Sequence, residues 1–340
     1  MRKALTLTLM LLMTTLSLSA QRVLAQNLTL YVFTDKSSYS LGDYVTIYGN
    51  LTKDGQPLPA TLVAIQVENS TRIIALRTLQ TEPPDIVYCP IYIWRVIPCD
   101  EWGNPQNEFP RPSPGGGSTA YFKVEYSNLS NETQVVLFTV NLFDATGISL
   151  GYSSLSGMSV LPRPESYNFT LPIPLTYDAR LGTATVYTSA FTDWPKLNGT
   201  AYCPEKSAPL NITGTEGYMK AKSLDTPLSQ GSSIKTAGEN GTYNMTLRLH
   251  PYTGTDTYTV YAASQNENQT ATATTTFYVT VKGDLNGDGA VDSTDLGILG
   301  WHWGALEGEP NYDPVSDLNG DGAIDSTDLG IMGIYWGYVS

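Results

Sequence analysis

GDLNGDGAVDSTDLGI, residues 283–298, is repeated almost letter for letter as SDLNGDGAIDSTDLGI, residues 316–331. Each copy places oxygen-bearing residues at the first, third, fifth, seventh, ninth and twelfth positions of a twelve-residue loop, with glycine at the sixth, where the chain turns sharply. The predicted ligands are Asp284, Asn286, Asp288, Ala290 (backbone carbonyl), Asp292 and Asp295, and then Asp317, Asn319, Asp321, Ala323 (backbone carbonyl), Asp325 and Asp328. Because calcium takes hard oxygen ligands from a loop wrapped around it, the spacing predicts two calcium sites.

The charge of this segment supports the prediction. A single acidic loop is also compatible with a solvated turn, but duplication and charge argue against that alternative here. Residues 283–340 contain eleven acidic residues and no Lys or Arg, in a chain of net charge −13. We expect the segment to fold fully only when bound dications neutralise part of this charge. Val291 and Ile324, at the eighth positions, are expected to point inward and to pair the two loops with each other.

The paired DxNxDGxxxxxD loops, each running into a helix with no helix before it, resemble type I dockerin domains. The resemblance implies two loop–helix halves related by a pseudo-twofold axis, and binding to a cohesin-like domain of a surface or scaffold protein. It places partner contacts around the tenth and eleventh loop positions, which are Ser293, Thr294, Ser326 and Thr327. The alternative is that these hydroxyls only satisfy backbone donors at the helix starts.

The helices depart from the clostridial pattern of the family. The positions where clostridial dockerins usually have a Lys-Arg pair hold Gly300 and Trp301 in the first copy, and Gly333 and Ile334 in the second. The endings HWG, residues 302–304, and YWG, residues 335–337, resemble those of dockerin-like modules in archaeal surface proteins. The expected partner is therefore cohesin-like rather than a clostridial cohesin.

The N-terminus predicts export. Basic residues precede an apolar stretch at residues 4–20, and small residues stand before Gln26, so residues 1–25 read as a signal peptide. A retained membrane anchor is the alternative. Eleven N-x-S/T sequons, none in the C-terminal repeat, agree with a glycosylated extracellular protein associated with the cell surface. Any membrane association is expected only through the signal segment.

The region between signal and repeat is predicted to be β. Apolar and polar residues alternate, for example at Val63, Ile65 and Val67, and Gly, Pro and Asn turns separate the runs. The predicted fold is mostly β, with two Ig-like β-sandwiches followed by a small helical domain carrying EF-hand-like loops. Residues 34–70 resemble the opening half of a macroglobulin-type Ig-like domain, and residues 241–281 resemble its closing half.

These resemblances predict a discontinuous domain organisation. We expect residues 26–81 and 212–282 to form one sandwich, residues 82–211 to form an inserted sandwich similar to a cell-adhesion-related (CARDB-like) domain, and residues 283–340 to form the dockerin. Three small domains in a row are the alternative, although a 55-residue sandwich is hard to stabilise alone.

Three cysteines, Cys89, Cys99 and Cys203, allow three disulfide pairings in an exported protein. Cys89 and Cys99 flank an expected strand that would hold them apart. The sequence therefore favours Cys99 with Cys203, which would tie the start of the inserted sandwich to its end.

The remaining residues favour binding over catalysis. His250 and His302 are the only histidines, and no nucleophile motif accompanies them, so we expect no enzyme activity. Polysaccharide binding is the second hypothesis, with the protein as a component of a cohesin–dockerin assembly for polysaccharide breakdown. Its candidate residues are Trp94, Trp102, Trp194, Tyr121, Tyr187 and Tyr202. The net acidity disfavours nucleic acid.

Overall fold

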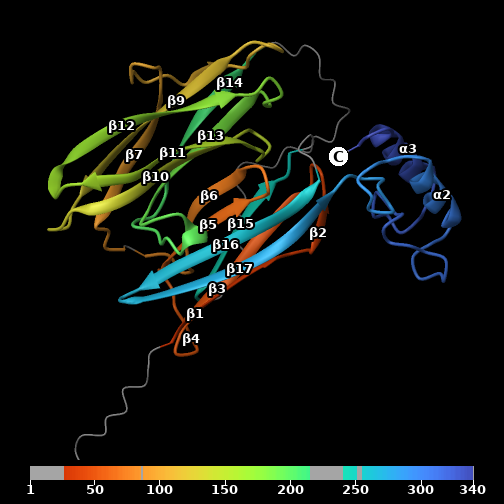
Figure 1. The fold of residues 1–340 in the computed structure, drawn as a ribbon, viewed down its shortest axis with the longest axis horizontal. Coiled ribbons are helices and arrows are strands. Elements are labelled where there is room, and N and C mark those ends of the chain that lie inside the picture. The colour runs from red at the N-terminus through yellow and green to blue at the C-terminus, as the bar shows by residue number, and fades with distance from the viewer. Residues whose placement is uncertain (1–26, 86, 215–239, 251–254, 340) are drawn as a thin grey trace, which may run out of the picture.

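The computed structural model describes residues 27–339 apart from residue 86 and the segments 215–239 and 251–254. The predicted signal peptide therefore lies outside the described residues. The described chain folds into four β-sheets, and two short helices follow them at the C-terminal end (Figure 1). The prediction of a mostly β chain followed by a small helical domain is confirmed. Neither of these helices is long and apolar enough to cross a membrane.

The first sandwich combines strands from both ends of the β region. One sheet, in the order β1-β3-β15, contains β1 (Leu28–Thr34), β3 (Tyr44–Lys53) and β15 (Thr242–Arg248), with β4 (Gln56–Pro57) paired to β3. The facing sheet, in the order β2-β17-β16-β5-β6, contains β2 (Ser38–Ser40), β17 (Gln269–Thr280), β16 (Asp256–Asn266), β5 (Leu62–Glu68) and β6 (Ile73–Gln80). Antiparallel pairing joins β15 to β3 and β16 to β5, across about 200 residues of sequence.

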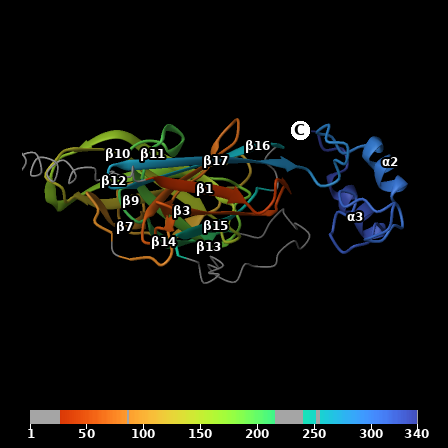
Figure 2. The ribbon, with the colours of Figure 1, turned by 90° about the horizontal axis from the view of Figure 1, so that it is seen from below.

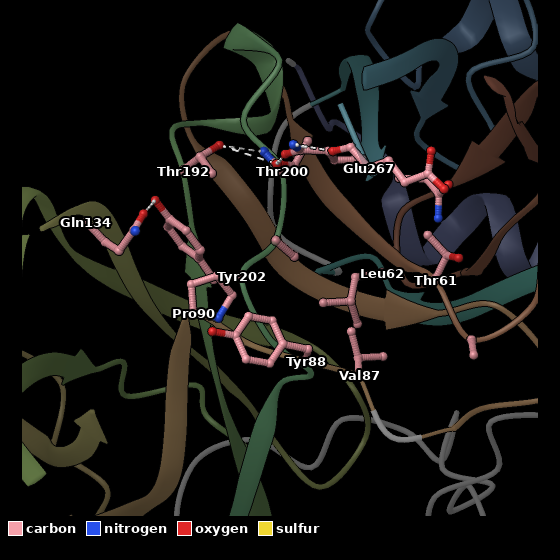
Figure 3. A pocket seen from close by; sticks show the side chains of 14 residues that line it. Thr61, Leu62, Val87, Tyr88, Pro90, Gln134, Thr192, Thr200, Tyr202 and Glu267 are labelled. Atoms are coloured by element: carbon pink, nitrogen blue, oxygen red, sulfur yellow. Dashed lines mark hydrogen bonds between the residues drawn. The ribbon is translucent and has the colours of Figure 1, made fainter. Parts of the chain in front are cut away.

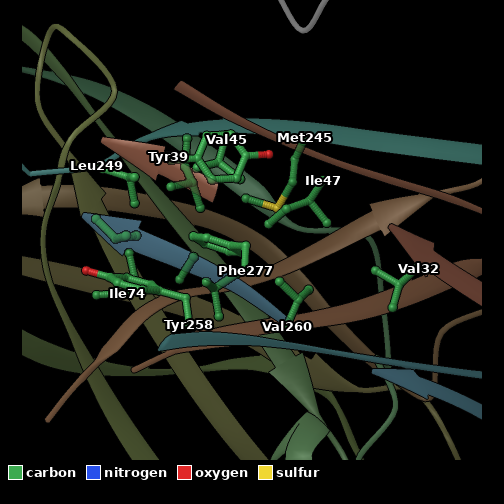
Figure 4. Close-up of a cluster of buried hydrophobic side chains, with 14 of the residues drawn as sticks. Val32, Tyr39, Val45, Ile47, Ile74, Met245, Leu249, Tyr258, Val260 and Phe277 are labelled. Atoms are coloured by element: carbon green, nitrogen blue, oxygen red, sulfur yellow. The ribbon is translucent and has the colours of Figure 1, made fainter. Parts of the chain in front are cut away.

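Alternating apolar residues of these strands form the core between the two sheets. Ile47 and Phe277 are fully buried, and Figure 4 shows their side chains pointing into the same cluster. The Phe277 ring packs edge-on against Tyr39 at 5.2 Å between ring centroids and stacks with Tyr258 at 5.1 Å. Each such side chain contributes about 1.5–3 kcal/mol by leaving water, so the alternation itself holds the sheets together.

The second sandwich is built from the strands between β6 and β15. Its smaller sheet, in the order β12-β9-β7, contains β12 (Arg163–Leu175), β9 (Ser118–Asn128) and β7 (Ile91–Cys99). Its larger sheet, in the order β11-β10-β13-β14-β8, contains β11 (Ser149–Val160), β10 (Gln134–Phe143), β13 (Gly182–Phe191), β14 (Lys206–Thr213) and β8 (Glu108–Pro110). A 3-10 turn, Pro195–Leu197, follows β13. Buried aromatic pairs such as Tyr126 and Phe138, with ring centroids 4.4 Å apart, fill the space between the sheets.

The two sandwiches pack against each other through a small buried cluster. It joins Ala64 and Leu76 of the first sandwich to Leu137 and Phe191 of the second. The backbone N–H of Leu76 also donates a 2.7 Å hydrogen bond to the side chain of the fully buried Asn141. The contact between the two sandwiches therefore combines apolar packing with a buried hydrogen bond.

The structure does not support the predicted disulfide between Cys99 and Cys203. All three cysteines are buried and unlinked in it. The Cys203 sulfur accepts a hydrogen bond from the backbone N–H of Ile93, near the start of β7. Cys99 lies six residues further along that extended strand, about 20 Å away at roughly 3.3 Å per residue, whereas a disulfide needs Cα atoms within about 7 Å.

Candidate functional site

The two C-terminal helices begin where the acidic loops end. The helices are α2 (Ser293–Trp301) and α3 (Ser326–Tyr335). The Asp292 carboxylate accepts a 2.7 Å hydrogen bond from the Thr294 N–H, and the Asp295 carboxylate accepts one of 2.9 Å from the Asp292 N–H. Asp325 and Asp328 repeat this reciprocal cap on α3. The ninth and twelfth loop residues therefore also start the helices, a role that the sequence analysis missed although Asp at a helix start signals it.

The first loop folds around its own carboxylates. One oxygen of Asp284 accepts hydrogen bonds from the Gly287 and Asp288 N–H groups at 2.8 and 3.1 Å, and the other accepts one from Gly289 at 2.9 Å. The Asp295 carboxylate reaches back to the Leu285 N–H at 2.7 Å, which closes the loop. Asp295 is completely buried and Asp284 nearly so. The first and twelfth positions therefore face the inside of the loop.

The second loop repeats this geometry with one addition. Asp317 accepts from the Gly320 and Gly322 N–H groups at 2.8 and 2.9 Å, and Asp328 accepts from Leu318 at 2.8 Å. In addition, the Tyr312 hydroxyl donates a 2.7 Å hydrogen bond to Asp317, which raises the pKa of Tyr312 to about 12. The two loops are therefore equivalent in backbone but not in surroundings.

Each loop pairs with the segment that follows the other half's helix. Gly337, after α3, donates to the Val291 carbonyl of the first loop at 2.9 Å, and Gly304, after α2, donates to the Ile324 carbonyl of the second at 2.8 Å. Both glycines have φ near +80°, a conformation that favours glycine and turns the chain toward the loop. Val291 and Ile324 are fully buried, as expected, but the expectation that the loops pair with each other is wrong.

Each half therefore pairs with the other half in the same way, as expected for two halves related by a pseudo-twofold axis. Residues 282–335 also match the family model of the type I dockerin domain. The C-terminal segment is a type I dockerin domain. Dockerins of this type bind calcium and dock to cohesins, and proteins that carry them are typically extracellular.

Other comparisons add little. No curated protein matches the chain. A solved β-glucuronidase from glycoside hydrolase family 2 aligns at 10% identity and a TM-score of 0.29, over 51% of this chain and 24% of its own. A putative β-galactosidase from Bacteroides fragilis and a β-glucuronidase from Parabacteroides merdae align at 10% and 9% identity, both with a TM-score of 0.25. These cover 51% and 52% of this chain but only 33% and 29% of their own. The chain thus spans a quarter to a third of the enzymes it matches.

The donor set of the dockerin loops fits calcium. Each loop offers carboxylate, amide and backbone oxygens, and each buries two carboxylates in a domain without Lys or Arg after Lys282. Within the described residues no cluster of three or more His, Cys, Asp or Glu side chains is arranged as a metal site. The chemistry of the loop explains this, because Asn286 holds the Asp288 carboxylate at 2.8 Å and Asp292 caps α2. Bound calcium would supply the positive charge that these loops otherwise lack.

The four predicted partner-binding residues lie exposed at the first turns of the two helices. Asp292 and Asp325 cap the backbone donors there, so the hydroxyls of Ser293, Thr294, Ser326 and Thr327 are not used for capping. The structure therefore does not show the alternative role, in which these four hydroxyls cap the helices. Their role in partner binding stays a prediction.

A pocket of about 620 Å³ lies where the two sandwiches meet (Figure 3). Tyr88 and Tyr202 line it together with Gln134 and Glu267. The Tyr202 hydroxyl donates to the Gln134 side chain at 3.2 Å, whereas the Tyr88 ring is 75% exposed. The pocket therefore combines aromatic and polar side chains from both sandwiches.

The six aromatic residues proposed for sugar binding do not form one surface. Trp102 is exposed on a loop and Trp94 is half-exposed on β7, whereas Trp194 packs into the junction between the sandwiches. Tyr187 is covered by the Arg77 guanidinium, 3.5 Å from the ring centroid. Of the six, only Tyr202 lines the pocket. The sixth, Tyr121 on β9, is half-buried.

Proposed function

We propose that this chain is an exported, non-catalytic modular protein of the cell surface. Its dockerin, loaded with two calcium ions, docks to a cohesin-like domain of a surface or scaffold protein, and its sandwiches serve as spacer or adhesion modules. The observation that carries the proposal is the reciprocal pairing of two equivalent acidic loops, each of which closes on a buried carboxylate. Family membership of the C-terminal segment supports the docking role.

The outer surfaces of the dockerin helices support a protein partner. We define the α2 face as Ser293, Leu296, Gly297, Gly300 and Trp301, and the α3 face as Ser326, Leu329, Gly330, Gly333 and Ile334; all ten are exposed. Their spacing places each set on one side of its helix. Trp301 is 76% exposed and Ile334 58%, so large apolar side chains point to solvent on both faces. Apolar surface of this kind is typical of interaction sites.

The helix glycines have no packing role within the described chain. A methyl group added at Gly297, Gly300, Gly330 or Gly333 would meet nothing within 4 Å. Glycine in a helix costs roughly 0.5–1 kcal/mol relative to alanine, so these positions forgo stability without an internal reason. Close approach of a partner's backbone to the helix gives that reason.

A calcium-dependent pull-down from solubilised surface proteins of the source cells tests the docking role. The full chain should retain a cohesin-like protein in calcium and release it in excess chelator. A variant with Leu296→Ser, Trp301→Ser, Leu329→Ser and Ile334→Ser should retain none, whereas Val315→Ser, at a 59% exposed apolar residue outside both faces, should bind normally. Equal retention by all three chains would refute docking through these faces.

Carbohydrate binding is the second candidate function, and the pocket at the junction favours it. A sugar ring would stack on Tyr88 or Tyr202, with Gln134 and Glu267 available for its hydroxyls. Affinity electrophoresis in soluble polysaccharides should then show retardation that Tyr202→Ala removes. The matched variant Trp102→Ala removes an exposed ring outside the pocket, and it should be retarded as strongly as the unmodified protein.

A further inference from the structure

The outer face of the sheet β1-β3-β15 carries three exposed aromatic rings, which we name the aromatic platform: Tyr31, Phe33 and Tyr48. They are 47%, 45% and 43% exposed. The Tyr31 and Phe33 rings lie 7° from parallel with centroids 6.2 Å apart, and the Phe33 and Tyr48 centroids are 5.7 Å apart. Figure 2 shows β1, β3 and β15 side by side along the first sandwich. A continuous group of exposed rings on a protein surface indicates a ligand or a cover.

Two asparagines adjoin the platform because of the strand register. Asn50 on β3 lies directly opposite Tyr31 on β1, and Asn244 on β15 lies directly opposite Tyr48 on β3. Directly opposed residues have Cβ atoms about 5 Å apart. Asn50 also follows Tyr48 by two residues, so both side chains leave the same side of β3. The platform therefore has an amide beside it on each of two neighbouring strands.

Both asparagines begin an N-x-T sequon, and the strand pleat presents each one outward. In Asn50-Leu51-Thr52 and Asn244-Met245-Thr246, the middle residue is buried in the core and the outer two face away from it. Within the described chain, no hydrogen bond engages the side-chain amide of either asparagine. Both side chains are half-buried, and their amides have no hydrogen-bond partner among the described residues that would compete with modification.

Other sequons differ in ways that the sequence does not reveal. Asn128 is 1% exposed, and its amide donates at 2.8 Å to the carbonyls of both Glu132 and Val160, so it is not open to modification. Asn211 on β14 is exposed, but its register partners are Thr183 and Glu108, neither of which has a ring. Burial and hydrogen bonding separate Asn128 from the platform asparagines, and strand register separates Asn211 from them.

We propose that Asn50 and Asn244 are N-glycosylated and that their first sugar residues lie on the aromatic platform. The donor is a lipid-linked oligosaccharide: the bond from sugar C1 to the lipid phosphate breaks, a C1–Nδ2 bond forms, the lipid phosphate leaves and the amide loses a proton to solvent. The apolar C–H face of the attached sugar then covers the rings. An attached glycan is favoured over a free polysaccharide because the linkage holds it beside the rings at high effective concentration.

The test uses the chain exported from an N-glycosylating host. Glycopeptide mass spectrometry should show sugar on Asn50 and Asn244 and none on Asn128. Sugar protons near the linkage should shift upfield in NMR spectra because they lie over aromatic rings, and Tyr48→Thr should remove that shift. Replacing Asn50 and Asn244 by Gln should lower Tm by a few degrees in the wild-type background but not in the Tyr48→Thr background.

Asn211→Gln is the matched control, because it removes an exposed sequon without a neighbouring ring; its effect on Tm should be independent of Tyr48. The proposal is overturned if Asn50 and Asn244 are unmodified while Asn211 carries sugar. It is equally overturned if they are modified without any coupling to Tyr48. Binding of a soluble polysaccharide by the unglycosylated chain, lost in Tyr48→Thr, would show that the platform serves a free ligand instead.

Discussion

The guanidinium of Arg77 on β6 and the carboxylate of Glu205, just before β14, form a two-pronged ion pair between the two sandwiches. The Nε–Oε2 and Nη2–Oε1 distances are 2.8 and 2.6 Å, and the side chains are only 12% and 16% exposed. Burial opposes the charge on Arg77, but Glu205 outweighs burial and raises the pKa of Arg77 above its ordinary value. The pair therefore fixes the two sandwiches through partners 128 residues apart.

Removing one member of this pair should leave the other charge buried without compensation. We expect Glu205→Gln to lower the free energy of unfolding by about 3 kcal/mol, measured by urea denaturation. Lys196→Gln is the control, because Lys196 pairs with Glu68 at 3.2 Å but is 40% exposed, and it should cost less than about 1 kcal/mol. Similar losses in both variants would contradict a special role for Arg77 and Glu205.

A second contact predicts an acid-dependent loss of stability. The His250 side chain lies 3.0 Å from Asp178 and, through this hydrogen bond, lowers the pKa of Asp178 to about 2 in the folded chain, against about 3.9 unfolded. The stabilisation is fully present above the unfolded value and is lost as pH falls from about 4 to about 2. Because solvent screening weakens the contact, Asp178→Asn should cost on the order of 1–2 kcal/mol at pH 7 and flatten the stability profile below pH 4. Glu101→Gln, at an exposed loop position, should leave that profile unchanged.

The twelfth loop residues should each control one calcium site. Asp295→Asn should abolish one of two binding events in isothermal titration calorimetry, Asp328→Asn the other, and the double variant both, because each carboxylate closes its own loop. At about a hundred times the dissociation constant, each lost site removes roughly 2.7 kcal/mol of stability. Glu309→Gln lowers the acidic charge equally, at a side chain that accepts a hydrogen bond from Leu306 and lies outside the loops, and should keep both events. Loss of both sites from either single variant would show that the loops do not act independently.

The exposed helix glycines should trade stability against binding. Gly297→Ala and Gly330→Ala together should raise the stability of the dockerin by about 1–2 kcal/mol, because alanine favours helix and nothing lies within 4 Å of the added methyl groups. The same variant should bind the partner from the pull-down more weakly in surface plasmon resonance. Gly304→Ala is the contrast, since φ of +82° makes it destabilising. Unchanged affinity would contradict close backbone approach at the helix faces.

The surroundings of the thiols predict how the cysteines react. Tyr88 and Pro90 line the same pocket as Ala201 and Tyr202, so Cys89 and Cys203 lie in neighbouring segments, and their thiols are close enough to interact electrostatically. Burial raises the pKa of Cys203 to about 12, which slows its alkylation in the folded chain. We expect peptide mapping of the oxidised, exported protein to link Cys89 to Cys203 and to leave Cys99 free. A fragment linking Cys99 to either other cysteine would contradict the fold around β7.

The predicted domain boundaries of the β region stay a prediction. They assign one sandwich to residues 26–81 and 212–282 and the inserted sandwich to residues 82–211. The strand partners show that β15 and β16 complete the sheets begun by β3 and β5. They also show that Ile212 belongs to β14, beside β13. Whether either sandwich folds alone depends on how much stability the junction supplies, which a deletion of the intervening residues measures.

The sequence by itself determined whatever depends on neighbours within about a dozen residues. Asp284 to Asp295 form a loop whose predicted ligand positions follow from spacing alone, and alternation along β3 distinguishes the buried side of that strand from its outer side. Along β5 it does not, because both sides of that strand are buried. The tertiary structure decided what depends on residues far apart. Strand register places Asn50 beside Tyr31. The path of the chain between distant segments pairs each loop with the opposite half and brings Cys203 beside Ile93. Short-range patterns do not encode these choices, because many registers would bury the same apolar residues and only the packed whole selects one.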